Sequence, residues 1–534
     1  MTGIVTLLAW PIVARGGDDP QRARGGAFFD VRDFGAVGDG RADDTDSLQA
    51  AIDAAGRTGG GVVRIPPGTW FSGTLHLRSR LTLEIARGAT LLASAHGGDF
   101  DDAERLPFST GSDGETTDFA HALLAGCDLE RVAIVGGGVI EMNRDSRIGP
   151  KPIALKRCRF VSVRDLTIVH APNYAVSLGG CDDVAIDGVT IREAYADGID
   201  PDCCRRVRIS NCDVQADDDA LCLKTSFLLG RQAVTEDVVV TNCRLASVSN
   251  CFKIGTESTG DVRRVLVSKC VLDGRPRDDR DLTGTAEGGG IAIQMVDGGT
   301  LDGVVVSDVV MTNVPAPIFV RVGDRGRDQE SDEPGRIRNV TIADVVATRA
   351  RGTASITGLA SRRVEGVTLR NVRIATLGTC DDPGDLDVPE RTGDYPKPGM
   401  FGELPAFGLY VRHARDIVLR DVALTLDASD ARPAMIADDV ASLEVDGLVC
   451  GASGGAGPAV WLHDVAGGAF RSRRAPDRVA MVVRVTGDRT RALTLAANTT
   501  GAAVDVAPES ANGVTLRTTD EIAGAPKRTP PRAG

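Results

Sequence analysis

A short pattern of hydrophobic and polar positions recurs along most of the chain, from about residue 130 to 450. It reads apolar-x-apolar, one or two polar residues, then apolar-x-apolar. The anchors Val163, Ile186 and Ile209 are spaced by 23 residues. Later anchors follow at wider intervals, at Val240, Val267, Val306, Ile342, Leu369, Leu419 and Val445. Strand-type alternation at this period predicts stacked coils.

Among stacked-coil folds, the pattern favours an all-β, right-handed parallel β-helix over a leucine-rich repeat, because Val and Ile dominate and the Leu and Asn signature is missing. In such a solenoid each inward side chain lies about 4.8 Å from its equivalent in the next coil. Cysteines in two phases then predict buried ladders, formed by Cys158, Cys181 and Cys204 and by Cys212, Cys243 and Cys270. A redox role for the vicinal pair Cys203-Cys204 is the alternative.

The segment before the repeats predicts an N-terminal capping helix. Leu48, Ala51, Ile52 and Ala55 fall on one helical face, after the capping residues 44–47 and before the glycines at 59–61. A solenoid needs its open end covered. We therefore expect one β-helical catalytic domain over residues 28–525, with a loop insertion at 372–408 and a flexible tail at 526–534. Residues 1–27 form either a degraded export signal or an unstructured leader.

Composition narrows the class of protein. Of the 534 residues, 42% are hydrophobic, 25% charged and only 4% aromatic, which excludes general disorder and a multi-span membrane protein and predicts a core of small aliphatic side chains. The net charge of −13 argues against nucleic acid as a partner. The 12 cysteines are too few for a disulfide scaffold and show no zinc spacing. We expect no cofactor and no metal.

Residues 193–226 hold a cluster of aspartates. Asp197 and Asp219 are 22 residues apart and begin similar phrases, so in adjacent coils they would lie close together, with Asp218 beside them. Two carboxylates about 5 Å apart repel by roughly 3 kcal/mol, enough to raise one pKa by about two units. Glycoside hydrolysis needs one protonated and one ionised carboxyl group. A solvated turn ladder or a calcium site is the alternative for this cluster.

Two groups of motifs carry a family resemblance. Residues 29–45, from Phe29-Asp30-Val31 to Asp43-Asp44-Thr45, look like the opening of pectin-degrading β-helix enzymes. Asp197-Gly198-Ile199-Asp200-Pro201-Asp202 and the segment 217–225, Asp-Asp-Asp-Ala-Leu-Cys-Leu-Lys-Thr, resemble two motifs of the polygalacturonase family, glycoside hydrolase family 28. The resemblance implies that Asp218 is the general acid, and that Asp197 and Asp219 hold and deprotonate a water, with inversion.

The sequence departs from the family at three positions. Tyr195-Ala196 replaces Asn-Thr before the first Asp, and Asn250 stands where the family has the His of Gly-His-Gly. The family's Arg-Ile-Lys, which grips a uronate carboxylate, falls on the segment 292–294, so Gln294 replaces its Lys. Both cations of that motif are therefore missing.

Stacking suggests a replacement for them. Aligning Leu223, Ile254, Ile293, Val320 and Val411 as inward residues places Lys224, Gln294, Arg321 and Arg412 in one outward column, and Lys253 in the next. We expect Lys224, Lys253, Arg321 and Arg412 to form a cationic stripe that binds an anionic sugar, with Asn250 and Gln294 in the same site. Ordinary solvent-facing positions of a sheet are the alternative.

The sequence therefore predicts a secreted or periplasmic glycosidase that acts on a pectin-type polysaccharide or its oligosaccharides. The insertion is expected to block one end of a groove, which would make the enzyme exo-acting. Its aromatic residues Tyr395 and Phe401 either stack on a sugar or fill the core of the loop itself. One rival is a lyase in which Asp197, Asp217 and Asp219 bind Ca²⁺ and Lys224, Lys253 or an Arg is the base. The other is a non-catalytic carbohydrate-binding β-helix.

Overall fold

The computed structural model describes residues 27–274, 287–378, 380–451, 457–472, 482–497 and 503–518. The leader predicted at 1–27, residue 27 excepted, and the tail predicted at 526–534 lie outside the described residues, as does the predicted domain boundary at 525. The described residues contain no helix long and apolar enough to cross a membrane.

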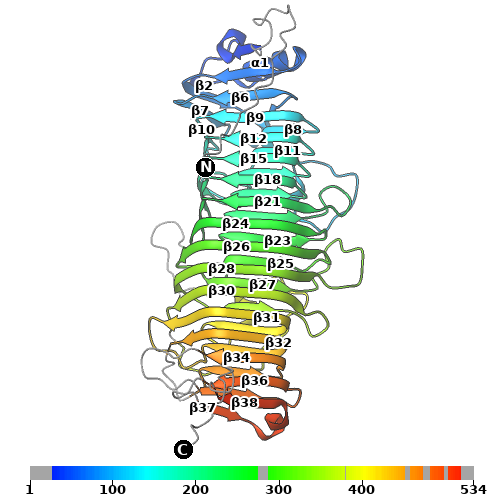
Figure 1. Cartoon of the computed structure of the whole chain (residues 1–534). Coiled ribbons are helices and arrows are strands. Elements are labelled where there is room, and N and C mark those ends of the chain that lie inside the picture. The colour runs from blue at the N-terminus through cyan, green and yellow to red at the C-terminus, as the bar shows by residue number, and fades with distance from the viewer. Residues whose placement is uncertain are drawn as a thin grey trace, which may run out of the picture.

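The chain is a right-handed parallel β-helix. Its strands pair in parallel with the strands one coil before and after them, and they form three rows along the solenoid (Figure 1). The row that carries the functional site, here called the site row, contains β5 (Leu75–His76), β8 (Ala122–Cys127), β11 (Lys151–Lys156), β14 (Val176–Gly179), β17 (Ile199–Asp202), β20 (Leu221–Thr225), β23 (Phe252–Ser258), β25 (Gly289–Met295), β27 (Ala316–Val322), β29 (Ala354–Thr357), the first parts of β31 (Leu409–Leu426) and β32 (Met435–Cys450), β33 (Val460–His463), β35 (Val482–Thr486) and β37 (Ala503–Val506).

The other two rows complete each coil. The second row contains β1 (Phe28–Asp30), β3 (Gly61–Ile65), β6 (Leu81–Ile85), β9 (Glu130–Gly136), β12 (Arg159–Arg164), β15 (Asp182–Asp187), β18 (Arg205–Ser210), β21 (Thr235–Thr241), β34 (Ala466–Ser472), β36 (Arg491–Ala497) and β38 (Val514–Thr518). The third row contains β2 (Asp39–Asp43), β4 (Gly68–Ser72), β7 (Ala89–Ala93), β10 (Val139–Glu141), β13 (Thr167–Val169), β16 (Thr190–Ala194), β19 (Asp213–Ala216) and β22 (Arg244–Ser247). Four longer strands belong to both rows: β24 (Val262–Asp273), β26 (Thr300–Thr312), β28 (Arg336–Ala350) and β30 (Val364–Thr376).

The predicted stacking of the coils is confirmed by the strand register. Val163 pairs with Ile186, Ile186 with Ile209, and the later anchors follow one another in the same way as far as Leu419 and Val445. From Gln294 onward the predicted outward column is in register, with one correction. Strand β29 was left out of it, so Thr357 lies between Arg321 and Arg412. A register shift between Leu223 and Thr225 interrupts the column at Lys224.

The interior is filled mainly by Val, Ile, Leu, Ala and Cys side chains, as the low aromatic content predicts. The cysteine ladder is confirmed, since the backbone N–H of Cys158 donates to Sγ of Cys181 at 3.4 Å and that of Cys181 donates to Sγ of Cys204 at 3.3 Å. All 12 cysteines are free. Burial raises the pKa of Cys203 well above its ordinary value, so this thiol is not an activated nucleophile.

The predicted cap is helix α1 (Thr45–Arg57), at the N-terminal end of the solenoid (Figure 1). It buries Leu48, Ala51, Ile52 and Ala55, the face predicted from their spacing, together with Ala54. The predicted capping residue Asp44 acts differently. Its carboxylate accepts the N–H groups of residues 37 and 38 at 2.6 and 3.0 Å and makes no cap bond to the helix.

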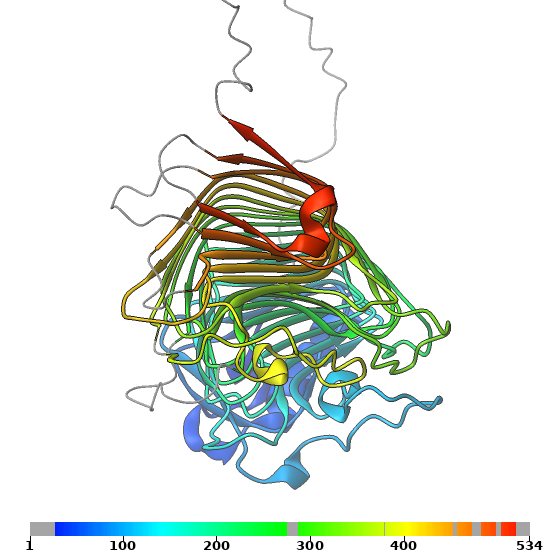
Figure 2. The ribbon, with the colours of Figure 1, turned by 90° about the horizontal axis from the view of Figure 1, so that it is seen from below.

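The other helices are short. They are α2 (Gly114–Thr117) and the 3₁₀ helices η1 (Val31–Phe34), η2 (Gly97–Asp99), η3 (Pro398–Phe401) and η4 (Pro508–Gly513). The loop 94–121, which carries α2, and the insertion, which carries η3, lie on the same side of the solenoid, in cyan and yellow in Figure 2. The insertion begins after Thr376 and not at residue 372, because residues 372–376 complete β30.

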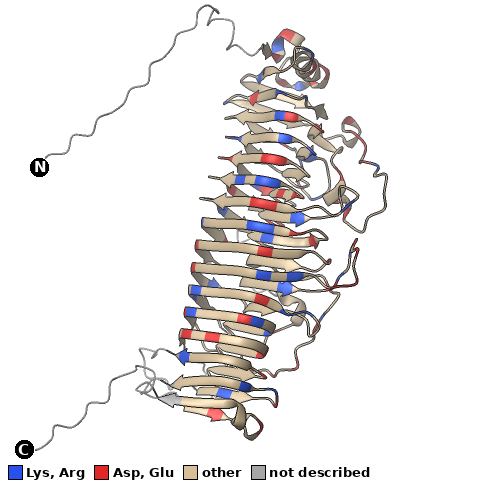
Figure 3. Ribbon diagram, turned by 45° about the vertical axis from the view of Figure 1, so that its right-hand side comes forward, with Lys and Arg blue, Asp and Glu red and all other residues tan. Residues whose placement is uncertain are grey.

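Charged residues of both signs are interleaved along the outside of the coils (Figure 3). Many pair one coil apart, as Arg205 does with Asp182 and Arg264 with Asp237. Such exposed pairs add little stability, about 0–1 kcal/mol each. They do keep single-sign charge from accumulating on these coils.

Candidate active site

Three consecutive turns place the acidic residues at the start of the site row. Asp197 comes just before β17, Asp218 and Asp219 just before β20, and Asn250 just before β23. Because β17, β20 and β23 pair in parallel, these turns stack on one another. The structure brings together Asp197, Asp218 and Asp219, with one carboxylate oxygen of each within 4.8 Å of the others.

Asp219 is buried and held in its ionised form. Its Oδ2 accepts from Nζ of Lys253 at 2.8 Å, and its Oδ1 accepts from Nδ2 of Asn250 at 2.6 Å and from Oγ of Ser249 at 3.2 Å. Burial raises the pKa of Asp219, but Lys253 and Asn250 outweigh burial and hold this pKa below its ordinary value. Asp219 is therefore suited to accept a proton.

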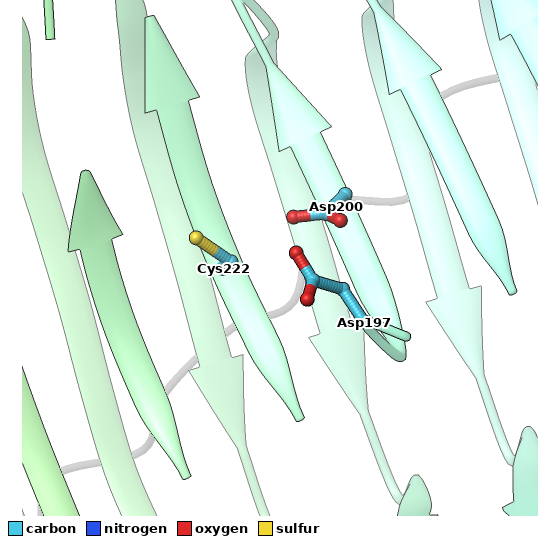
Figure 4. A group of neighbouring side chains, drawn as sticks. All are labelled: Asp197, Asp200 and Cys222. Atoms are coloured by element: carbon cyan, nitrogen blue, oxygen red, sulfur yellow. The ribbon is translucent and has the colours of Figure 1, made fainter. Parts of the chain in front are cut away.

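Asp197 has the opposite electrostatic environment. It accepts the backbone N–H of Asp219 at 3.2 Å and the ammonium of Lys224 at 2.8 Å, and the carboxylates of Asp197 and Asp200 approach each other (Figure 4). Burial, followed by the charges of Asp200, Asp218 and Asp219, raises the pKa of Asp197 well above its ordinary value, against the effect of Lys224. Asp197 can therefore stay protonated at a pH at which Asp219 is ionised.

Asp218 is the most exposed carboxylate of the three, with 29% of its side chain accessible. Its Oδ2 accepts from Arg147 at 2.7 Å. Its backbone carbonyl accepts from Oγ of Ser247 at 2.5 Å, which fixes the turn. Asp218 is thus the member of the trio whose side chain an incoming molecule can reach directly.

Each of the three carboxylates has its own cation, Lys224 for Asp197, Lys253 for Asp219 and Arg147 for Asp218. A cluster neutralised in this way offers little net charge to a divalent cation, whose sites gain affinity from the charges of several carboxylates. The lyase alternative also grouped Asp197 with Asp217 and Asp219. Among the described residues, the carboxylate that joins those of Asp197 and Asp219 belongs to Asp218 and not to Asp217.

The two lysines cannot serve as the base of a lyase at neutral pH. Burial lowers the pKa of Lys224, but Asp197 and Asp200 outweigh burial and raise it well above its ordinary value. Asp219 does the same for Lys253. Both side chains therefore remain ammonium groups and cannot abstract a proton.

The acidic cluster opens into a cleft of about 350 Å³. One side is lined by Asp217, Asp218, Val248, Ser249 and Asn250, and the other by Glu287 and by Tyr395, Pro396 and Lys397 of the insertion. Tyr395 is half exposed, and its hydroxyl lies 3.2 Å from Nζ of Lys253. Its ring is therefore available to a sugar at the cleft, whereas Phe401 is buried in a cluster that joins the insertion to the outer face of the site row.

The loop 94–121 covers the site row on the N-terminal side of the cleft. Its Thr110 donates to Asp328, beyond β27, at 2.7 Å, and Phe119 packs with Leu228, which follows β20, over the strands. Glu115 of α2 accepts two bonds from Arg147, at 3.0 and 2.6 Å. The insertion therefore lines the cleft directly, whereas the loop reaches Asp218 of the cleft through Glu115 and Arg147.

The predicted cationic stripe is divided. Lys224 and Lys253 lie in the acidic cluster, where each is bound to an aspartate. Arg321 is only 1% exposed and donates to the carbonyls of residues 358, 390 and 391, and Arg412 donates to the carbonyl of Val388. The expectation that Arg321 and Arg412 face the substrate is therefore wrong in this structure, because the insertion covers them.

Gln294 is also buried away from the cleft, where its Oε1 accepts from Thr256 at 3.3 Å. Asn250, in contrast, stands at the predicted place. Its Nδ2 serves Asp219, and its Oδ1 accepts the backbone N–H of Gly289 at 2.8 Å. Both ends of this amide are bonded, so Asn250 orients Asp219 without a proton of its own to exchange.

Sequence reasoning missed Arg147 and Glu115. Both stand in loops outside the repeat pattern, at 71 and 103 residues from Asp218, so neither stacking nor spacing pointed to them. Neither residue stands out in its own connection, because Arg144 accompanies Arg147 and the loop 94–121 contains six acidic residues besides Glu115. Tyr174, whose ring centroid lies 3.9 Å from Nζ of Lys224, was missed as well. It lies inside the repeat, two residues before β14 as Asp197 lies two residues before β17, so stacking could have found it.

Similar proteins share this site region. The sequence model of glycosyl hydrolases family 28 matches residues 137–383, and that of rhamnogalacturonase A/epimerase, pectate lyase-like, matches residues 28–84. The chain is 25% identical over 375 residues to a "Probable polygalacturonase" of Vitis vinifera, covering 64% of this chain and 73% of that protein. It is 23% identical over 364 residues to an "Endo-polygalacturonase" of Pectobacterium carotovorum subsp. carotovorum, covering 63% and 85%.

The fold is shared with a solved structure, an exopolygalacturonase from Thermotoga maritima, at a TM-score of 0.57 and 20% identity, covering 76% of this chain and 93% of that one. The family match spans the three turns that hold Asp197, Asp218, Asp219 and Asn250. The predicted resemblance is thus confirmed: residues 137–383, which hold the three aspartates, match glycosyl hydrolases family 28.

Proposed function

We propose that the protein hydrolyses a glycosidic bond in a pectin-type polysaccharide or in its oligosaccharides. The observation that carries this proposal is the convergence of three carboxylates, one exposed and two buried with opposite pKa shifts, at a cleft of about 350 Å³. A cleft of this size suits a small part of a saccharide chain. Relatives named as polygalacturonases support the class of substrate.

In this proposal Asp218 protonates the leaving oxygen, because its side chain lines the cleft. Asp219 accepts the proton of the attacking water, because Lys253 and Asn250 keep it ionised. Asp197 holds that water from its other side. A water with hydrogen bonds of about 2.8 Å to two oxygens can bridge a gap of up to roughly 5 Å, and the oxygens of Asp197 and Asp219 lie within 4.8 Å.

A bridged water attacking opposite the leaving group gives inversion at the anomeric carbon. In most inverting enzymes the acid and the base are about 6.5–9.5 Å apart, and in retaining enzymes about 5–5.5 Å. Here the carboxylate oxygens of Asp218 and Asp219 lie within 4.8 Å, which is shorter than either range. We assign inversion because two carboxylates flank the place of the water, and the anomeric form of the first product, followed by NMR, tests this assignment directly.

Exo action is the second part of the proposal. The insertion lines one side of the cleft, and Glu115 of the loop 94–121 reaches Asp218 through Arg147. We propose that these two segments close one end of the cleft. A cleft closed at one end admits the end of a chain more readily than its middle. Tyr395, with its exposed ring at the cleft, would stack on the terminal sugar.

We also propose that the protein works outside the cytoplasm, because plant polysaccharide lies outside the cell that digests it. Cell fractionation of the native host, with the activity measured in culture fluid, periplasm and cytoplasm, tests this. Activity confined to the cytoplasm would favour action on imported oligosaccharides.

The decisive variant for the function is Asp218→Asn. Wild type should release reducing ends from polygalacturonate or its oligomers without the near-ultraviolet absorbance of an unsaturated product. Asp218→Asn should lose at least about 100-fold in kcat, with its thermal stability maintained, because the side chain is partly exposed. A wild type that binds these sugars and cleaves none of them would make the protein a carbohydrate-binding β-helix.

A further inference from the structure

Arg147 makes an unusual set of contacts at the mouth of the cleft. It lies between β10 and β11, in a loop that reaches over the turns of the site row. Its Nη1 donates to Asp218 at 2.7 Å, while its Nε and Nη2 donate to the two oxygens of Glu115 at 3.0 and 2.6 Å. One guanidinium therefore joins the exposed carboxylate of the active site to helix α2 of the covering loop.

Arg147 differs from Lys224 and Lys253 in its accessibility. Its side chain is 42% exposed, against 3% for Lys224 and 4% for Lys253. Those two lysines are held by buried aspartates, and Arg321 and Arg412 are covered by the insertion. Of the four cations predicted to recognise an anionic sugar, none presents a free face to the cleft. Lys397 lines the cleft but is paired with Glu287 at 2.7 Å, and Arg147 is the exposed cation that contacts Asp218.

The present partners of Arg147 are exchangeable. Glu115 and Asp218 are themselves 30% and 29% exposed, and ion pairs between exposed groups are weak, about 0–1 kcal/mol each. A guanidinium presents a planar fork that binds a carboxylate through two parallel hydrogen bonds. A carboxylate on a bound sugar could therefore replace one of these partners at little cost.

We propose that Arg147 binds a carboxylate of the substrate, and that Asp218 and Glu115 hold it in position until the substrate arrives. The inference rests on the proposed function and extends it to the class of sugar, an unesterified uronate. Transfer of Arg147 from Asp218 to the sugar also frees Oδ2 of Asp218 to face the leaving oxygen.

The test compares a free uronate oligosaccharide with its methyl ester, which has the same ring and no charge. Wild type should prefer the free acid in kcat/KM. Arg147→Ala should raise KM for the free acid roughly 10- to 100-fold, the effect of losing a charged hydrogen bond, and leave KM for the ester within about twofold. Arg147→Lys, which keeps the charge and loses the fork, should fall between the two.

Arg327→Ala is the matched control. Arg327 is 34% exposed and holds the same covering loop through Asp113 at 3.1 Å, without a contact to Asp218 in the structure. Its substitution should leave the preference for the free acid unchanged. If Arg147→Ala lowers the rate on both substrates equally, or changes only thermal stability, Arg147 is a loop clamp and the inference is wrong. If wild type cleaves neither substrate, the proposed function itself fails.

Discussion

The ammonium of Lys253 lies 2.8 Å from Oδ2 of Asp219, and both side chains are almost completely buried. Asp219 has two buried hydrogen-bond donors, Lys253 and the amide of Asn250. Together they create an ionised carboxylate at a depth where burial alone would favour the protonated acid. Asn250, which replaces the family's His, and Lys253, three positions later, thus keep the proposed base Asp219 ionised.

Lys253→Met should remove this support and cost activity and stability together. Removing one partner of a buried ion pair costs about 3–5 kcal/mol, and kcat should fall about tenfold or more at pH 7. Because the pKa of Asp219 lies below its ordinary value in the folded protein, its contribution to stability is present above about pH 4 and is lost as the pH falls through the folded-state pKa. The stability gap between wild type and variant should therefore narrow at low pH.

Chemical denaturation at several pH values, with kcat measured on the same preparations, checks this prediction. Lys253→Arg, which keeps the charge, is the control and should retain more of both. A constant stability gap between pH 3 and 8 would show that Lys253 acts through packing and not through the charge of Asp219.

Asp200→Asn should stabilise the protein at neutral pH. Burial raises the pKa of Asp200 against the effect of Lys224, so above about pH 4 the unfolded residue loses a proton that the folded residue keeps. The free energy of unfolding therefore falls as the pH rises from there. The amide side chain of the variant does not titrate, so this fall in the free energy of unfolding disappears. Lys224 is then paired with Asp197 alone. A gain of about 1 kcal/mol or more is expected at pH 7.

Thermal unfolding across pH 3.5 to 8 measures this effect. The two melting temperatures should converge toward pH 4 and separate above it. Asp145→Asn, at an exposed carboxylate, should follow wild type at every pH. A variant that is less stable than wild type at pH 7 would show that Asp200 is needed as a charge for Lys224.

Chelators should leave the activity unchanged within about twofold, because Lys224, Lys253 and Arg147 already neutralise the three aspartates. The measurement is the rate of reducing-end release before and after dialysis against EDTA, with and without added Ca²⁺. Loss of activity in EDTA and its recovery with Ca²⁺ would restore the calcium-dependent alternative.

The proposed closure of one end of the cleft predicts exo products. Early digests of a uronate polymer should contain one short product, while the viscosity of the solution falls slowly. Chromatography of the products at a few per cent conversion, together with viscometry, distinguishes the two modes. A rapid fall in viscosity with a ladder of long fragments would mean that the covering loops admit the middle of a chain.

The sequence predicted the solenoid well because the repeat is local. Val163, Ile186 and Ile209 pair in the structure at the spacing that their pattern predicts. Strand β29 was left out of the predicted outward column because its segment, Ala354–Thr357, is four residues long and carries a single large aliphatic side chain. The acidic turns precede β29 in the chain, so this omission did not affect their alignment.

The site was only partly predictable, and the reason is physical. The aspartates belong to the repeat, so stacking was enough to bring Asp197 and Asp219 together. Arg321 lies in the repeat as well, but what covers it depends on a loop whose path the repeat does not determine. The same holds for Arg147, which reaches Asp218 from a connection three coils away.

The central claim, hydrolysis by the aspartate trio, is tested most directly by the masses of the products from a defined uronate oligosaccharide. Hydrolysis predicts saturated products whose masses sum to the substrate plus one water, formed by wild type and not by Asp218→Asn. Products that sum to the substrate alone, with one of them unsaturated, would mean elimination and would contradict the account. Bound and intact substrate would contradict it too.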